Sequence, residues 1–303
     1  MASENLAGRT IAGYRLLERV GEGGTAEVYR ADHPEHGSCA FKVLRPRLRG
    51  DPTAVKRFLR EASYGARVRH PSVVRTYDFG EADGLYYLAL EWAGGQSLAD
   101  FLHQNAPVAP ALAVGIVTQL AAGLAAAHQV GIVHRDLKPE NIVYDSATHV
   151  AKLLDFGIAR DAELPPEERL TRTGFFVGTL QYVAPEALSG ELVDARADIY
   201  SLATMAYYML TARHPFSGRN PRELFQQLLK ESPLRLSEAL PERRFPGALE
   251  AAVMRGLSRD PGQRQHTVEE FAQQVAAGAG DAPPSSGPGL LGAFRKLMGG
   301  KRE

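Results

Sequence analysis

The sequence predicts an α+β fold with two lobes, in which a small antiparallel β-sheet lobe with one main helix precedes a larger α-helical lobe. Strand-like runs dominate up to residue 91, and helical periodicity dominates after the glycines at 94 and 95. We place the small lobe at residues 14–91, the hinge at 92–95 and the large lobe at 96–276. With 303 residues, 44% of them hydrophobic, the chain can bury a core in each lobe.

Five strands and one helix are expected in the small lobe. The strand-like runs are separated by glycine or proline and cover residues 14–20, 25–32, 38–44, 73–79 and 85–91. A helix is expected over residues 53–68, because Val55, Phe58 and Ala62 recur at helical spacing and Asp51 supplies a start signal. The hinge glycines that follow give the chain freedom to cross between the lobes.

The large lobe is expected to consist mainly of helices. The clearest helical segments cover residues 109–129, 197–210, 221–231, 248–257 and 267–277. Residues 277–303 form a linker and a short tail, because the stretch 281–289 is rich in Pro, Gly and Ser and has no side chain that could build a core.

The last residues of the chain predict a short basic amphipathic helix. Apolar side chains recur at helical spacing with basic ones beside them: Leu290, Leu291, Phe294, Leu297 and Met298, with Arg295, Lys296, Lys301 and Arg302. So short a helix is marginal by itself in water. Three alternatives stay open for this tail: disorder, docking on its own large lobe or a partner protein, and contact with a membrane surface.

Charge and cysteine content exclude several classes of protein. Lys plus Arg and Asp plus Glu are equal, at 35 each, so no overall charge favours nucleic acid. The single cysteine, Cys39, excludes an intramolecular disulfide and suits a reducing compartment, so a cytoplasmic location is expected. The first ten residues lack an apolar signal core, and no window is expected to approach the roughly 18 to 20 apolar residues of a membrane helix. We therefore expect no transmembrane segment.

The most informative run of the sequence is H-R-D-L-K-P-E-N at residues 134–141, followed by a D-F-G run that starts at Asp155. Together they supply two carboxylates, an ammonium and an amide, which is the set that phosphoryl transfer needs. We expect Asp136 to be the catalytic base and Lys138 to neutralise charge that develops during transfer. Asn141 and Asp155 are expected to bind Mg2+, with Mn2+ as an alternative. Each acid alone fits an ordinary loop carboxylate, but the whole set at these spacings argues against chance.

A glycine-rich stretch between the first two strands is expected to hold the phosphates of ATP. Its small residues let backbone amides approach phosphate oxygens without a side-chain clash. The residues expected to bind nucleotide here are Val20, Gly21, Glu22, Gly23, Gly24, Thr25, Ala26 and Val28. Taken alone, a G-x-G without a third glycine is more often a hairpin turn, so this assignment depends on the strand that follows.

That strand carries Lys42. The two-residue period puts Ala40 and Lys42 on one face of the strand. A lysine on a strand is usually a solvated side chain. Here Glu61 falls in the middle of the lone helix, where it is placed to pair with Lys42 and fix the ammonium on the α and β phosphates.

In this order, the motifs resemble the eukaryotic-like (Hanks-type) serine/threonine protein kinase family, and most of all its bacterial branch. The resemblance runs from about Tyr14 to Ala276 and includes the A-P-E run that ends at Glu186. It implies the bilobal protein kinase fold and transfer of the γ-phosphoryl group of Mg-ATP to Ser or Thr hydroxyls of proteins. The presence of Lys138 and Thr179 resembles the pattern of the serine/threonine class. This resemblance implies that Thr179 contacts the catalytic loop as part of the substrate platform.

The resemblance also implies which residues surround the adenine. Leu90 occupies the gatekeeper position, and Glu91 with Ala93 would form the hinge that contacts the base. The residues that would enclose the base are Val28, Ala40 and Val143.

Some residues are implied to be structural. Asp198 resembles the buried aspartate that anchors the backbone of the catalytic loop, and Arg264 resembles the partner of Glu186. His134 is expected to be architectural rather than an acid-base group.

Arg135 directly precedes Asp136. An arginine at this position resembles the pattern of kinases that are switched on by phosphorylation of the activation loop, because a guanidinium near the base favours a bound anion. Thr171 and Thr173 are the expected autophosphorylation sites, and Arg135 with Arg160 would bind the product. A plain polar loop is the alternative.

The sequence departs from the family pattern at two notable positions. Ala26 replaces the third glycine of the loop, where bacterial relatives tolerate small residues. Gly65, four residues after Glu61, leaves a gap where larger residues often pack, and it weakens the helix by about 1 kcal/mol relative to alanine. We expect this helix to move easily.

Two alternatives compete with an active protein kinase. A pseudokinase scaffold usually lacks one of Lys42, Asp136 or Asp155, and all three are present. A small-molecule kinase of related fold is disfavoured by the A-P-E run and the threonine-bearing loop, which resemble a platform for a polypeptide. Protein substrates are therefore the expected partners, and a homodimer stays open.

Overall fold

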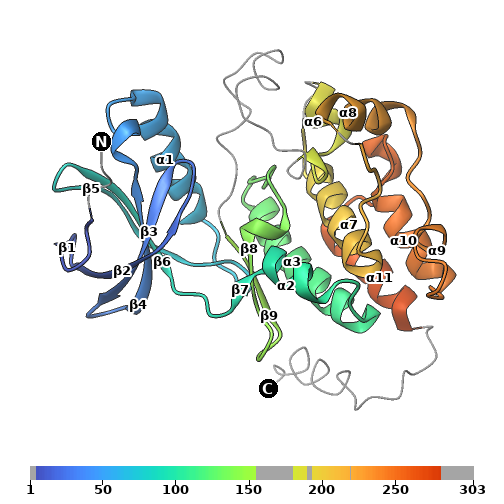
Figure 1. Cartoon of the computed structure of the whole chain (residues 1–303), viewed down its shortest axis with the longest axis horizontal. Helices are drawn as coiled ribbons and strands as arrows, with labels where there is room; N and C mark the ends of the chain where they lie inside the picture. Colours follow the sequence, from blue (N-terminus) through green and yellow to red (C-terminus); the bar gives the residue numbers. More distant parts are fainter. Residues whose placement is uncertain (1–4, 155–179, 190–192, 219, 281–303) are drawn as a thin grey trace.

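The computed structural model describes residues 5–154, 180–189, 193–218 and 220–280, which form two lobes (Figure 1). The small lobe holds one antiparallel sheet, the α-helix α1 and a short 3-10 helix at Pro46–Leu48, and the large lobe holds the other described α-helices with a second, short sheet. The chain passes between the lobes after β6 (Leu85–Glu91). The predicted α+β architecture of two unequal lobes is confirmed.

The sheet of the small lobe has six strands in the order β1-β2-β3-β4-β6-β5. Besides β6, these strands β1 to β5 cover Thr10–Ile11, Tyr14–Glu22, Ala26–His33, Gly37–Leu44 and Thr76–Ala82. The five predicted strands are present, and β1 precedes them. The bounds differ most at β5, which begins three residues later than predicted because Val73 and Val74 pair with Leu153 instead.

One face of this sheet buries a cluster of aromatic and aliphatic side chains, among them Tyr29 and Phe41. Cys39 belongs to this cluster: its side chain is fully buried, its Sγ donates to the carbonyl of Gly37 at 3.3 Å, and burial raises the pKa of the thiol. Leu6 and Ile11, which precede the predicted start of the lobe, are also fully buried here. The first residues of the described chain are therefore part of the small lobe's core.

The other face of the sheet packs against α1 (Pro52–Gly65). The helix begins where predicted, because the Asp51 carboxylate accepts a hydrogen bond from the Thr53 amide at 2.9 Å. It ends three residues before the predicted end. At that point a Cβ on Gly65 would lie 3.1 Å from the Thr76 hydroxyl, so the close approach to β5 favours glycine.

The large lobe is built around α7 (Arg196–Thr211), most of whose side chains are buried. The other described helices are α2 (Leu98–Asn105), α3 (Pro110–Gln129), α6 (Pro185–Ser189), α8 (Pro221–Lys230), α9 (Leu236–Ala239), α10 (Gly247–Gly256) and α11 (Val268–Gly280). The five helices predicted for this lobe are present, with bounds within three residues. The helices α2, α6 and α9 were not predicted, because segments of four to eight residues are too short to establish a helical period.

Helix α3 corrects one expectation. Among the described residues it is the one helix that is long and apolar enough to cross a membrane, with 20 residues and a mean hydropathy of 1.7 in its most apolar window. The expectation that no window comes close was therefore wrong. Half of that window is buried inside the protein, and α3 packs against α7, α11 and β9 (Val150–Leu153). Its apolar composition is accounted for by this central position.

The second sheet was not predicted. It has the order β7-β8-β9 and consists of β7 (Gln96–Ser97), β8 (Ile142–Asp145) and β9, whose two to four residues are too few for a visible two-residue period. The Leu153 amide donates to the Ser72 carbonyl at 2.8 Å, and the Val74 amide donates to the Leu153 carbonyl at 2.9 Å. The sheet therefore joins the segment between α1 and β5, which makes a second connection between the lobes besides the hinge.

Candidate active site

The loop between α3 and β8 brings three of the predicted functional residues together. The Asn141 amide group donates to the Asp136 carbonyl at 2.8 Å and to its Oδ2 at 3.1 Å. The Lys138 ammonium lies 3.4 Å from the same Oδ2. A carboxylate, an ammonium and an amide thus converge within one loop, as the spacing of the motif predicts.

A buried carboxylate on α7 holds the backbone of this loop. Asp198 is fully buried and accepts hydrogen bonds from the amides of His134 and Arg135, both at 2.9 Å. The predicted anchoring role of Asp198 is therefore confirmed. The Nε2 atom of His128, near the end of α3, lies 2.7 Å from Asp198 Oδ2, a partner that the sequence did not reveal. His134 is fully buried, as expected for an architectural residue.

The predicted pair of Glu186 and Arg264 is also present. The guanidinium binds the carboxylate through two hydrogen bonds of 2.7 Å, and both side chains are buried. Arg264 also lies over the ring of Tyr200, with its central carbon 5.0 Å from the ring centroid. This ion pair connects α6, which contains Glu186, to the loop before α11, which contains Arg264. The position of α6 in the large lobe is thereby fixed.

Some of the residues predicted to bind nucleotide in the small lobe line a cavity of about 150 Å³. Lys42 of β4 and Glu61 of α1 both line it. Of the residues expected to bind nucleotide, the ones that line the cavity besides Lys42 are Gly23, Thr25, Ala26, Val28 and Leu90. The register explains why: Val28 lies opposite Lys42, and Lys42 lies opposite Leu88, so these side chains share the face that packs on α1.

The cavity extends further than the sequence suggested. It is also lined by Phe58, Ala62, Gly65, Val74 and Thr76. Gly65 therefore lines the space between α1 and the sheet, but the Thr76 hydroxyl lies so close that the expected gap for a larger side chain is absent at this position. The expected residues that do not line this cavity are Val20, Gly21, Glu22, Gly24, Ala40, Glu91, Ala93 and Val143.

Two arginines hold the glycine-rich loop. Arg45 donates to the Gly23 carbonyl at 3.2 Å and forms an ion pair with Glu22, and Arg47 donates to the Gly24 carbonyl at 2.9 Å. No sequence signal singles out either arginine, because the contact exists only when β4 folds back against β3. The loop therefore has its carbonyls fixed by side chains from the end of β4.

The hinge has an ion pair of its own. Glu91 pairs with Lys152 of β9, and it also accepts a hydrogen bond from the Arg75 amide at 3.2 Å. No pattern in the sequence connects Glu91 to Lys152, which lies 61 positions later. The side chain of Glu91 is thus engaged in holding β9 against the hinge.

A partly buried histidine, His214, lies beside the residues that precede α6. The His214 ring stacks on Tyr208 at 4.6 Å and meets Tyr182 edge-on at 5.4 Å. Burial lowers the pKa of His214 to about 4, and burial raises the pKa of the Tyr182 hydroxyl. Both groups are therefore neutral near pH 7.

Several predicted residues lie outside the described part of the chain: Asp155, Phe156, Gly157, Arg160, Thr171, Thr173 and Thr179. Arg135, which is expected to bind Thr171 or Thr173 after phosphorylation, is among the described residues. It has a left-handed φ of 63°, and its Nε is buried without a hydrogen-bond partner among the described residues. The roles assigned to these residues stay proposals.

A metal is supported by the chemistry of Asn141. Its side-chain nitrogen donates hydrogen bonds to Asp136, so the side-chain oxygen is the atom suited to bind a hard cation. The described residues contain no group of three or more His, Cys, Asp or Glu side chains that could hold a metal by themselves.

The two-lobed fold and this loop define the protein kinase class. Residues 14–274 match the protein kinase domain, so the chain belongs to the protein kinase family.

The chain is similar to bacterial serine/threonine-protein kinases. It is 38% identical to PknB of Mycobacterium leprae over 293 residues, which are 94% of this chain and 46% of that protein. It is 40% identical to pkn2 of Myxococcus xanthus over 281 residues, 91% of this chain and 34% of that protein. The chain thus spans less than half the length of these relatives. The resemblance to the bacterial branch is confirmed.

Solved structures agree on the fold. The kinase domain of Mycobacterium tuberculosis PknI superposes with a TM-score of 0.69 at 32% identity, covering 90% of this chain and 99% of that one. Residues 1–466 of Rad53 in complex with AMP-PNP superpose with a TM-score of 0.70 at 27% identity, covering 87% and 65%. The predicted bilobal protein kinase fold is confirmed.

Proposed function

We propose that this chain is an ATP-dependent serine/threonine protein kinase that transfers the γ-phosphoryl group of ATP, bound with Mg2+ or Mn2+, to Ser or Thr hydroxyls of proteins. The observation that carries the proposal is the cluster of Asp136, Lys138 and Asn141, held in place by Asp198. The similarity to bacterial serine/threonine-protein kinases supports the same conclusion.

Asp136 orients the attacking hydroxyl and accepts its proton. Lys138, 3.4 Å from that carboxylate, is placed to neutralise charge that grows on the transferred group. Because this charge is largest in the transition state, the ammonium accelerates transfer rather than merely binding substrate.

Asn141 and Asp155 would hold the metal, which would supply charge neutralisation at the phosphates. Lys42, positioned by Glu61, would bind the α and β phosphates from the cavity that both residues line. The glycine-rich loop would cover the phosphates, and Leu90, Glu91 and the apolar residues Val28, Ala40 and Val143 would surround the base.

The domain, its regulation and its location complete the proposal. The kinase domain covers residues 14–276, with the hinge at 92–95, and the tail covers 277–303.

Phosphorylation of Thr171 or Thr173 would create an anion that Arg135 and Arg160 would bind. The Nε of Arg135 lacks a partner among the described residues. Thr179 would contact the catalytic loop in the substrate platform. The single, buried Cys39 fits work in a reducing compartment such as the cytoplasm.

The test is a phosphorylation assay with labelled ATP, Mg2+ and a general protein substrate such as myelin basic protein. We expect the unaltered chain to label both the substrate and itself. Asp136→Asn keeps the shape of the side chain and removes its basicity, so transfer is expected to fall by at least a hundredfold while ATP binding is retained.

The matched control is Asp83→Asn in the turn between β5 and β6. Asp83 is exposed and has a φ of 53°, a conformation that asparagine also accepts, so this variant should label substrate at the normal rate. Equal labelling by the Asp136→Asn variant would refute the base assignment. No labelling by the unaltered chain, despite normal ATP binding, would favour a scaffold without catalytic activity.

A further inference from the structure

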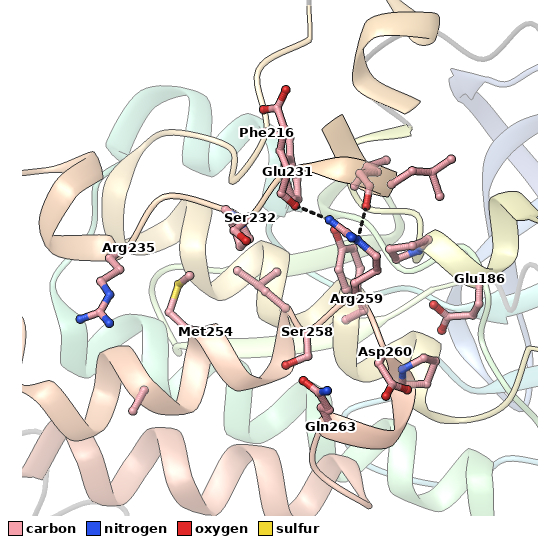
Figure 2. A pocket seen from close by; sticks show the side chains of 18 of the residues that line it. Glu186, Phe216, Glu231, Ser232, Arg235, Met254, Ser258, Arg259, Asp260 and Gln263 are labelled. Atoms are coloured by element: carbon pink, nitrogen blue, oxygen red, sulfur yellow. Dashed lines mark hydrogen bonds between the residues drawn. The ribbon is translucent and has the colours of Figure 1, made fainter. Parts of the chain in front are cut away.

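We propose that the C-terminal segment, residues 290–303, docks into a groove on the large lobe of its own chain. The groove has a volume of about 1050 Å³ and lies between α8, α10 and the loop after α10 (Figure 2). The described residues that line it belong to the large lobe and exclude the catalytic loop. It is therefore a site separate from the one proposed for phosphoryl transfer, and the inference does not depend on that function.

The floor of the groove is apolar. Phe216, Leu228 and Leu257 line it and are buried, and the half-buried Met254 points its thioether into the open space (Figure 2). In the loop that forms one edge, Leu234 is 56% exposed. A hollow of this size accommodates several apolar side chains, and burying each would contribute about 1.5–3 kcal/mol before ordering costs.

The rim of the groove is acidic. The carboxylates of Glu231, Glu250 and Asp260 lie on it, and Glu231 makes no side-chain hydrogen bond or ion pair with the described residues. Arg259 is already engaged, because its guanidinium donates to the carbonyls at the end of α8: Leu228 at 3.1 Å and Glu231 at 2.7 Å (Figure 2). The remaining basic side chain on the rim, Arg235, is 4.0 Å from Glu250. Carboxylates therefore outnumber available cations.

The chain leaves the described structure next to this rim. Gly278, near the end of α11, lies so close to the backbone of Ala248 and Leu249 that a Cβ there would collide with it. The neighbouring Gly247 and Glu250 line the groove. The nine residues 281–289 can span at most about 30 Å, which is sufficient to bring the next residues over the groove.

The sequence of the segment matches the groove. Its apolar residues, Leu290, Leu291, Phe294, Leu297 and Met298, suit the floor, and its basic residues, Arg295, Lys296, Lys301 and Arg302, suit the rim. Tethering favours the chain's own tail over a second copy, because a short linker gives an effective concentration on the order of millimolar. A bound tail would lie against Pro185 and Glu186, which form one end of the groove.

The test is zero-length cross-linking of the full chain at low micromolar concentration. A water-soluble carbodiimide activates a carboxylate, and a lysine amine in contact displaces the resulting urea to form an amide. We expect mass spectrometry of the monomer to find Lys296 or Lys301 joined to Glu231, Glu250 or Asp260. Phe294→Ser with Leu297→Ser should lower the yield at least fivefold, because the apolar contacts are removed while every reactive group is kept.

Two further variants complete the design. Met254→Lys changes the floor of the groove and should lower the same yield to a similar extent, provided that its melting temperature is unchanged. Ser285→Ala with Ser286→Ala, in the linker, is the matched control and should leave the yield unaltered. The proposal is overturned if these links are missing from the monomer, if they occur only between two copies, or if the Phe294 and Leu297 variant retains them.

Discussion

Asp198 determines the conformation of the catalytic loop from a distant part of the chain. It accepts hydrogen bonds from two successive amides, of His134 and Arg135, at 2.9 Å each. Arg135 has a φ of 63°, a conformation that costs a non-glycine residue about 1–3 kcal/mol. The two bonds to a buried charge offset this cost. The position of Asp136 therefore depends on a residue of α7.

His214 leads to a prediction about stability at the same scale. Its folded-state pKa of about 4 lies below the value of about 6.5 expected in the unfolded chain, because burial disfavours the charged ring. The unfolded state therefore binds the proton first. The stability contributed by neutral His214 is complete above about pH 6.5 and is lost as the pH falls toward 4, to a total of about 3 kcal/mol. Urea unfolding between about pH 7 and pH 4.5 measures this loss.

Two variants isolate this contribution. His214→Phe keeps an aromatic ring against Tyr182 and Tyr208 and cannot be protonated, so its free energy of unfolding should fall less between these pH values than that of the unaltered chain. His103→Gln, at an exposed position of α2, should keep the full dependence. Equal slopes for His214→Phe and the unaltered chain would contradict the assignment.

At the scale of elements, the glycine-rich loop depends on the end of the neighbouring strand. Arg45 and Arg47 bind the carbonyls of Gly23 and Gly24, which fixes the loop beside the cavity lined by Lys42.

We expect Arg45→Ala with Arg47→Ala to weaken ATP binding about three- to tenfold, since each lost hydrogen bond contributes about 0.5–1.5 kcal/mol to ordering the loop. Competition against a fluorescent nucleotide measures the dissociation constant. Arg69→Ala, an exposed arginine after α1, is the matched control and should bind ATP normally. If the double variant binds ATP as tightly as the control, the arginines do not order the loop for the nucleotide.

At the scale of the whole molecule, the two lobes are joined at more than the hinge. The backbone bonds of Leu153 to Ser72 and Val74 connect β9 to the segment before β5, and Lys152 pairs with Glu91. A nucleotide held by Lys42 on one side and by Asn141 on the other would add a further connection between the lobes.

We therefore expect ATP with Mg2+ to stabilise the folded chain as a unit. At a hundredfold excess over its dissociation constant the ligand adds about 2.7 kcal/mol to the free energy of unfolding. Differential scanning calorimetry should show a single transition that moves to higher temperature. Chelation by EDTA should reverse most of the increase, because the phosphates would lose the metal that Asn141 and Asp155 are proposed to hold. An identical increase in EDTA would contradict the metal assignment.

The sequence predicted the molecule well where the information is contiguous. The catalytic loop was predictable because Asp136, Lys138 and Asn141 lie within six residues, and the long helices were predictable because they show several periods. The contacts of His128, Arg45 and Lys152 were not, since each joins residues that only the fold brings together. The short strands β7, β8 and β9 carry too few residues to show any period.

The location of Cys39 makes the molecule convenient for spectroscopy. It is the single cysteine of the sequence, and its thiol is enclosed under the sheet of the small lobe. A thiol that is buried and has a raised pKa reacts slowly with maleimides and iodoacetamides. Cysteines introduced at exposed positions of the two lobes would therefore take up fluorophores selectively, so that opening and closing of the lobes could be followed by energy transfer without first removing a native residue.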